Sequence, residues 1–210
     1  MFTATKEMAM ARPKEFDPED VVEKAMQVFW RHGYENASLP DLLEGMGLTR
    51  GSLYKAFKDK KNLFLLVLDR YETTAVDTGV AMLRDAGLGD GRQRIIRLFT
   101  GLVAAVDAGD NRGCLLCTAA AGSAANDPDI AQVVQAGLAK FQIGFQLALR
   151  ETPTLARLSE PERLRLADAL LTQYVGLRML VRSQLPLGVL AHAVAGVDDI
   201  LGGAGLRRFP

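Results

Sequence analysis

The sequence predicts an all-α protein, with a small N-terminal domain of three helices followed by a larger helical domain. Apolar residues recur every three or four positions along most of the chain, as they do on the buried face of a helix. Capping residues and prolines mark the expected helix starts, and no segment alternates as a β-strand does. Of the 210 residues, 49% are hydrophobic, which is enough for a sizeable core. We expect about nine helices, arranged as an arm over residues 1–14, a domain over 15–61 and a second domain over 62–210.

The first helix is expected to begin after Asp17. Residues 17–20 read Asp-Pro-Glu-Asp, which combines a capping side chain, a proline at the first helical position and acids in the first turn. Gly33 follows Arg31 and His32 and can end the helix. The apolar stripe between these ends consists of Val22, Ala25, Met26 and Phe29.

Residues 38–57 read as two short helices joined at Gly47. Ser38 is a good N-cap, and Asp41 places a carboxylate at the positive end of the first helix. Gly47 permits the left-handed turn that commonly ends a helix. Thr49 can then cap a second helix over residues 50–57, so the stretch predicts a helix-turn-helix.

The second of these helices has an outward face suited to DNA. Leu53 and Phe57 face the core, while small and long polar side chains remain outside, as a helix entering the major groove requires. Residues 47–61 hold five basic residues and one acidic residue, a net charge of +4, whereas the whole chain has 25 of each sign. Positive charge is therefore concentrated where phosphates would lie. An ordinary helical hairpin with a solvated basic face is the alternative interpretation.

The stretch from residue 11 to residue 71 resembles the N-terminal domain of the TetR/AcrR family of bacterial transcription regulators. Beyond residue 71 only the length and the all-helical pattern agree with that family. The resemblance implies a DNA-binding regulator, usually a repressor, that acts as a homodimer in the cytoplasm. The elements that carry it are Phe29, Gly33, Tyr34, Ser38, Asp41, Leu42, Gly47, Leu48, Ser52, Leu53, Tyr54, Phe57, Lys60, Leu63 and Phe64.

The same resemblance implies which residues contact DNA. Ser38 would cap its helix and touch a phosphate, Tyr54 would contact the DNA backbone, and Lys60 would hold a phosphate. Two features depart from the family pattern: Ala37 stands where many relatives have threonine, and Pro40 lies in the first turn of a helix, where its missing N–H is tolerated. The groove-facing residues would be Thr49, Arg50, Gly51, Ser52 and Lys55, with Arg12 and Lys14 reaching DNA from the N-terminal arm.

Other classes of protein find little support in the sequence. The longest apolar run near the first domain, residues 63–68, is far too short to span a membrane, and no secretory signal is evident at the N-terminus. Two cysteines without such a signal indicate a reducing cytoplasm. Two histidines and the absence of a nucleophile–base pair argue against an enzyme, a metal site or a cofactor.

The second domain is expected to consist of helices over residues 62–84, 92–108, 114–125, 128–151, 160–185 and 187–201. Residues 98–149 hold six charged side chains in 52 positions, against 24% for the chain, so this stretch is expected to be buried. In a family that binds small molecules it would also line the effector cavity. Core packing is the alternative role for these side chains. The candidate pocket residues are Met82, Phe99, Cys114, Phe141, Phe145, Gln173, Tyr174 and Arg178.

The expected helix over residues 160–185 is apolar on nearly every side, so it must be covered on two sides. A homodimer would cover it, and would also place two recognition helices about 34 Å apart to read a palindrome. The residues expected at the interface are Leu170, Leu177, Val181, Leu190, Val194, Val197 and Leu201.

Cys114 and Cys117 form a C-x-x-C motif that allows two interpretations. A redox or electrophile sensor would use the proximity of two sulfurs one helical turn apart, whereas the plainer interpretation is two small buried hydrophobes. Arg178, in an apolar helix, must be paired with an acid or face an anionic effector. The predicted function is therefore a repressor released from a palindromic operator by a small molecule. The alternatives are thiol-based regulation and DNA binding without a ligand.

Overall fold

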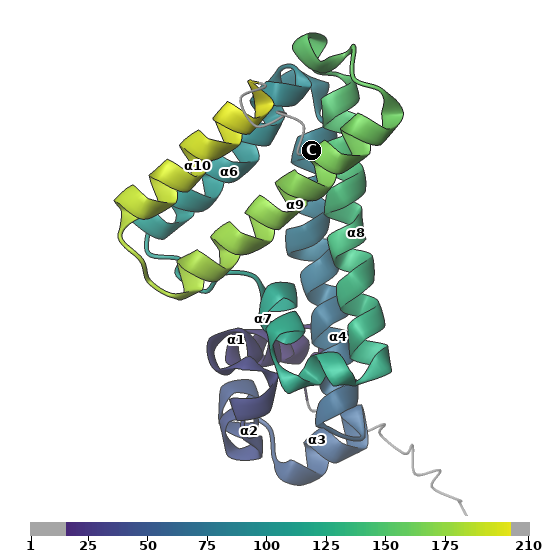
Figure 1. The fold of residues 1–210 in the computed structure, drawn as a ribbon. Helices are drawn as coiled ribbons and strands as arrows, with labels where there is room; N and C mark the ends of the chain where they lie inside the picture. The colour runs from purple at the N-terminus through teal and green to yellow at the C-terminus, as the bar shows by residue number, and fades with distance from the viewer. Residues whose placement is uncertain (1–15, 203–210) are drawn as a thin grey trace, which may run out of the picture.

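The computed structural model describes residues 16–202, and this part of the chain is entirely helical (Figure 1). The lower body holds α1 and the two short helices α2 and α3, and a long rod rises from it into the upper body. With α4 and α5 counted as one rod, the described helices number nine, as the sequence predicts. The first elements are α1 (Pro18–Asn36), α2 (Leu39–Met46), α3 (Arg50–Phe57) and α4 (Lys60–Tyr71).

The predicted start of the first helix is confirmed, whereas the helix continues beyond the predicted end at Gly33 to Asn36. The Asp17 carboxylate accepts a hydrogen bond from the backbone N–H of Glu19 at 3.0 Å. Gly33, with φ of 78°, interrupts the helix between its main part and a last turn. A left-handed residue at this point costs little because it is glycine. The aromatic rings of Phe29, Tyr34 and Phe64 then pack together, with centroids 4.7–6.1 Å apart, and join α1 to α4.

The rod differs from the single α-helix predicted over residues 62–84. It begins at Lys60 and contains a π-helical turn, Glu72–Val76, before α5 (Asp77–Arg84). Lys140 pairs with Glu72 at 2.6 Å and with Asp77 at 2.7 Å, so one ammonium joins both ends of this turn. Leu66 lies on the outer side of the rod and is 46% exposed.

The upper body is built around α8 (Pro128–Arg150), which lies beside the rod (Figure 1). At one end of α8, a Cβ on Gly91 would lie only 1.6 Å from the Ala148 carbonyl oxygen, so α6 begins there in direct backbone contact. The helix predicted over residues 114–125 is shorter, because Gly122 interrupts it before a 3-10 turn. The remaining helices are α6 (Gly91–Asp107), α7 (Leu115–Ala121), α9 (Glu160–Arg182) and α10 (Leu187–Leu201).

The lower and upper bodies share the rod and make further polar contacts. The predicted domain boundary at residue 61 falls in the first turn of α4. Glu35, near the end of α1, accepts hydrogen bonds from Ser123 Oγ at 2.9 Å and from the Ala124 N–H at 2.7 Å. The two bodies are thus attached at more than one place. Within the described range, none of the helices has the length and hydropathy needed to cross a membrane.

Candidate functional site

The α2–turn–α3 unit is held by local hydrogen bonds that the sequence pattern predicts. Ser38 and Asp41 form a reciprocal capping box: the Ser38 N–H donates to Asp41 Oδ2 at 2.9 Å, and the Asp41 N–H donates to Ser38 Oγ at 3.3 Å. The Ser38 hydroxyl and N–H also hold the pKa of Asp41 below its usual value. Gly47 adopts the left-handed conformation, with φ of 67°. The predicted turn between the two helices is therefore confirmed.

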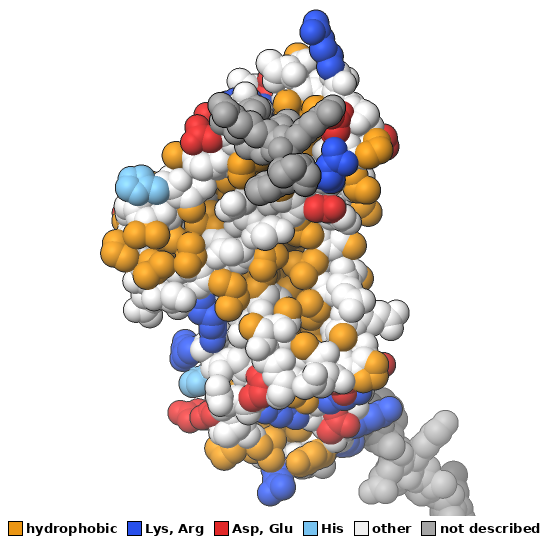
Figure 2. Space-filling view, viewed as in Figure 1, with side chains coloured by type: hydrophobic (Ala, Val, Ile, Leu, Met, Phe, Trp, Pro, Cys, Tyr) orange, Lys and Arg blue, Asp and Glu red, His pale blue; other side chains and the backbone are white. Residues whose placement is uncertain are grey.

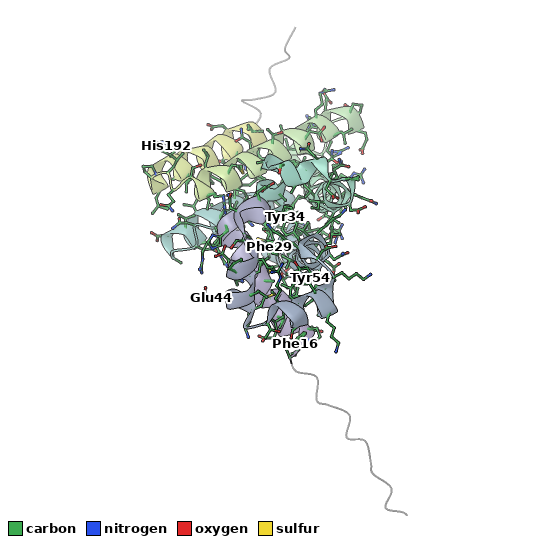
Figure 3. All side chains as sticks on the ribbon, turned by 90° about the horizontal axis from the view of Figure 1, so that it is seen from below. Phe16, Phe29, Tyr34, Glu44, Tyr54 and His192 are labelled. Atoms are coloured by element: carbon green, nitrogen blue, oxygen red, sulfur yellow. The ribbon has the colours of Figure 1, made fainter. Side chains whose placement is uncertain are left out.

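The predicted α3 is confirmed in its bounds, and one face of it is open to solvent. Thr49 accepts from the Ser52 N–H at 3.2 Å, and the two hydroxyl groups are 3.0 Å apart. Arg50 lies over the Tyr54 ring at 5.7 Å, and Tyr54 is 44% exposed. Lys55 is exposed as well, and the structure describes no ion pair for it. Figure 3 views the molecule from this end and shows Tyr54 there, away from His192 on α10.

Gly51 has no atom within 4 Å of the place where its Cβ would be, so the start of α3 is open to the approach of a large partner. Leu53, by contrast, is fully buried and anchors the opposite face of the helix. One face of α3 is therefore buried and the other is open to solvent, as the sequence predicts. The predicted contacts Arg12 and Lys14 lie outside the described residues.

The basic residues that follow α3 are not all free. Lys60 donates to the Glu35 carbonyl oxygen at 3.3 Å and lies 4.8 Å from the Tyr34 ring centroid. Burial lowers its pKa. Lys61 pairs with Asp127 at 2.7 Å and Asp129 at 2.8 Å, at the start of α8. Part of the positive charge counted in the sequence therefore joins the two bodies, and the free basic side chains are concentrated on α3.

Four of the candidate pocket residues form one aromatic cluster in the upper body. Phe99, Phe141, Phe145 and Tyr174 are each at most 2% exposed, and the ring centroids of Phe141 and Tyr174 are 4.4 Å apart. These rings pack on one another, which agrees with core packing. Gln173 does not join them, since it lies on the exposed face of α9 one residue before Tyr174.

Beside this cluster, the two cysteines lie with polar groups from three helices. Both thiols are 3% exposed. Cys114 lies beside Cys117 and beside Tyr71, the last residue of α4, and both neighbours lower the pKa of its thiol. Arg178 Nε donates to Tyr174 Oη at 3.2 Å, and its Nη1 donates to the Gly113 carbonyl oxygen at 3.3 Å.

The sequence did not identify the contacts that extend this cluster to α1. Arg182, one turn after Arg178, donates to the Trp30 carbonyl oxygen at 2.8 Å and to the Arg31 carbonyl oxygen at 3.2 Å. Arg112 stacks over the Trp30 ring at 4.0 Å. Figure 2 shows Lys and Arg side chains at this junction of the two bodies. An arginine that ends an apolar helix gives no sign in the sequence of which carbonyl groups it will meet.

The predicted interface residues require a correction. All seven are at most 8% exposed in the single chain, so they belong to its own core, and of the seven only Val194 also lines the groove between α6 and α10. α9 and α10 carry more apolar side chains than a single buried face requires. Some of the apolar side chains beside the buried positions are therefore exposed to solvent. Figure 2 shows apolar side chains at the outer end of α10, where Leu185, Leu187 and Val189 are 36–42% exposed. Residues 98–149 are likewise only partly buried, since α6 and α10 border an apolar groove of 730 Å³.

The helix-turn-helix unit also identifies the family. Residues 21–67, which span α1 to most of α4, match the family model described as bacterial regulatory proteins, tetR family. Residues 21–67 therefore form an N-terminal domain of the TetR family. Among the described residues, no group of three or more His, Cys, Asp or Glu side chains is placed to hold a metal ion.

Relatives of known name agree with this assignment. The HTH-type transcriptional repressor ComR of Escherichia coli K12 is 52% identical over 60 residues, which is 29% of either chain. The HTH-type transcriptional regulator YezE of Bacillus subtilis 168, described as uncharacterized, is 28% identical over 192 residues, covering 91% of this chain and 94% of that protein. The strong similarity to ComR is thus limited in length, and the similarity to YezE extends over both bodies.

A solved structure extends the similarity to the whole fold. A cysteine mutant of the TetR family transcriptional regulator CifR, in complex with 26-base-pair double-stranded operator DNA, superposes with a TM-score of 0.76 at 28% identity. The match covers 91% of this chain and 98% of CifR. The fold of this chain is therefore similar to that of a TetR-family regulator, with a helix-turn-helix domain and a helical second domain.

Proposed function

We propose that this protein is a dimeric transcriptional repressor that leaves a palindromic operator when a small molecule binds its second domain. The observation that carries the proposal is the open face of α3. Arg50, Tyr54 and Lys55 are exposed on a helix whose opposite face is anchored by fully buried Leu53. Such a helix can enter the major groove without deforming the domain that holds it.

Thr49, Arg50, Gly51, Ser52 and Lys55 are proposed to face the groove. Arginine and lysine can donate hydrogen bonds to guanine edges, and the hydroxyl groups of serine and threonine can donate to or accept from base edges. Ser38, Tyr54 and Lys60, with Arg12 and Lys14 of the arm, are proposed to contact phosphates. The operator complex of CifR supports DNA as the partner.

A homodimer is proposed to place the second recognition helix. The surface offered for it consists of the outer faces of α9 and α10, including Leu187 and Val189, which are 39% and 42% exposed. The groove between α6 and α10 continues this apolar surface. Two copies joined there would bring two α3 helices to successive turns of the duplex, about 34 Å apart.

The effector is proposed to bind beside the aromatic cluster, among Met82, Phe99, Phe141, Phe145 and Tyr174. An effector releases DNA only if it prefers the conformation with low operator affinity. The rod α4–α5 and the Arg182 contacts connect this region to α1, so a shift in the upper body can change the separation of the two α3 helices.

A second candidate mode of control is thiol chemistry at Cys114 and Cys117. It is favoured by the position of Cys114 between Tyr71 of the rod and Arg178 of α9. DNA binding without any ligand is the third mode. A gel shift on the operator, with candidate small molecules and oxidants added, separates them. If none of these compounds changes the shift, both sensing modes are wrong and the constitutive mode stands.

A further inference from the structure

Arg178 carries a positive charge that no carboxylate neutralises in the described part of the chain. Its guanidinium donates to Tyr174 Oη and to the Gly113 carbonyl oxygen, at 3.2 and 3.3 Å. The positive charge of Arg178 contributes to the lowered pKa of Asp110, but the Asp110 carboxylate is itself paired with Arg112 at 2.8 Å. The Arg178 side chain is partly buried, and a cation withdrawn from water is costly unless a nearby group compensates it. An anion is therefore expected beside Arg178.

Cys114 is the group that can supply this anion. Tyr71 from α4, Cys117 from α7, and Tyr174 and Arg178 from α9 all face it. The hydrogen bond from Cys117 lowers the pKa of Cys114 to about 6, with Arg178 and Tyr71 acting in the same direction against the effect of burial. The pKa of Cys117 is raised, first by its hydrogen bond to Cys114. Of the two sulfurs, Cys114 therefore holds the thiolate.

The two sulfurs can also reach each other. Side chains one helical turn apart have Cβ atoms about 5–6 Å apart, and a disulfide needs about 3.5–4.5 Å. Cys114 lies before the first residue of α7 in an extended conformation, with φ of −116° and ψ of 129°. It also follows Gly113, whose φ is 72°. The missing distance can therefore be closed by a movement of Cys114, at the cost of the hydrogen bonds that its carbonyl oxygen accepts from the N–H and hydroxyl of Thr118.

We propose that Cys114 and Cys117 form a dithiol switch that a small, uncharged hydroperoxide converts into an intramolecular disulfide, with Arg178 holding the attacking thiolate. The effect on DNA rests on the proposed function, whereas the thiol chemistry does not. Because both cysteines are 3% exposed, a small uncharged oxidant is favoured over a bulky one. Bulky electrophiles are disfavoured on the same ground.

The reaction has two balanced steps. The Cys114 thiolate attacks one oxygen of hydrogen peroxide, an S–O bond forms as the O–O bond breaks, and hydroxide leaves, giving sulfenic acid. Cys117 sulfur then attacks the Cys114 sulfur, an S–S bond forms as the S–O bond breaks, and the departing hydroxyl takes the Cys117 proton as water. Peroxide is reduced to water, and the two thiols are oxidised together.

The disulfide would act on α1 through the loop before α7. A Cβ on Gly113 would lie 2.7 Å from the Arg178 carbonyl oxygen, so this loop fits closely against α9. The next residue back, Arg112, stacks on Trp30 and donates to Gln27 Oε1 at 2.8 Å. Oxidation removes the anion beside Arg178 and pulls the loop toward α7. Both changes disturb the packing of this loop against α1, and α1 belongs to the same body as α2 and α3.

Intact mass spectrometry of the full-length protein tests the chemistry. Reduced protein is treated with hydrogen peroxide as the probe. The wild type is expected to lose the mass of two hydrogens, Cys117→Ser to gain oxygen atoms at Cys114, and Cys114→Ser to remain unchanged. A wild type that keeps both thiols, or that only cross-links between chains, overturns the proposal. Equal oxidation rates of the two single variants would also overturn it, because Cys114 would not be the attacking residue.

The pH profile of the oxidation rate tests Arg178 as a positioning residue. The midpoint is expected near pH 6 in the wild type, and Arg178→Met should move it toward the ordinary thiol value of about 8.5. Arg178→Lys, which keeps the charge, should return it toward the wild-type value. Circular dichroism shows whether Arg178→Met folds. If the Arg178→Met variant does not fold, the midpoint of the wild-type pH profile is used alone. A wild-type midpoint above pH 8 would then overturn the role of Arg178.

Operator affinity before and after peroxide tests the transmission. The wild type should lose affinity by roughly 5–150-fold, the usual range of allosteric coupling, and regain it with dithiothreitol. The Cys114→Ser variant should bind the operator with an affinity that peroxide does not change. If the disulfide forms and the operator affinity does not change, the proposed effect of the disulfide on α1 is wrong. A reduced protein that binds no DNA overturns the proposed function and leaves the result of the mass measurement standing.

Discussion

Individual side chains on α3 divide into anchors and contacts. Leu53 is fully buried, while Lys55 extends from the same short helix into solvent. The capping residues Ser38 and Thr49 are predictable from the sequence because a cap depends on neighbours within one helical turn. The orientation of Gln173 was predicted wrongly, since the phase of a helix that is apolar on several sides depends on distant neighbours.

Replacement of Lys55 by alanine is expected to weaken operator binding by about 1–3 kcal/mol for each recognition helix. The physical reason is the removal of a cation from the base edges or phosphates, while the packing inside the protein stays intact. Fluorescence anisotropy with a labelled operator measures the effect. Arg97→Ala removes the same charge from an exposed position of α6 and should leave the affinity unchanged. Equal losses of affinity in both variants would contradict the assignment of α3.

At the scale of elements, helix starts were predicted more accurately than helix interiors. The α6 and α8 starts follow from Asp90 and Asp127, whose carboxylates accept from N–H groups of the first turn. The π-helical turn in the rod was not predictable, because its extra residue is held by Lys140, more than 60 positions away in the sequence. Such a turn is a response to tertiary packing and has no local pattern.

Two glycines of α6 give a matched test of the helix contacts. Gly91→Ala is expected to destabilise the protein by several kcal/mol, since its Cβ would lie 1.6 Å from the Ala148 carbonyl oxygen and overpacking at backbone is severe. Gly101→Ala meets no atom within 4 Å and should stabilise the same helix by about 0.5–1 kcal/mol. Thermal unfolding compares the two. If Gly91→Ala melts like the wild type, α6 does not approach α8 as closely as described.

At the scale of the whole molecule, the contacts between the bodies decide how a signal passes. Arg182→Gln is expected to cost about 1.5–3 kcal/mol of stability, the usual value for hydrogen bonds made by a charged group. It should also speed hydrogen exchange at the end of α1, where Arg182 binds the Trp30 and Arg31 carbonyl oxygens. Arg165→Gln, on the exposed side of α9, is the control. Unchanged exchange in α1 would exclude Arg182 as a coupling contact.

The proposed dimer can be tested on its apolar surface. Ala191 lines the groove between α6 and α10, and Ala191→Arg should produce a folded monomer with weak operator binding. The physical cause is the volume of the new side chain, which overfills the groove once a second copy covers it. Leu66→Arg, on the exposed side of α4, should remain dimeric. Sedimentation velocity distinguishes the two states, and a dimeric Ala191→Arg would move the interface elsewhere.

The function proposed for this protein depends above all on α3 reading a palindromic operator as one of a pair. The most direct measurement selects DNA fragments with the wild-type protein and then footprints the bound sequence. Two protected half-sites about one helical turn apart are expected, at a stoichiometry of one dimer per site, and both should disappear with Lys55→Ala. Selection of fragments without a shared palindrome, or protection that survives in Lys55→Ala, would contradict this role of α3.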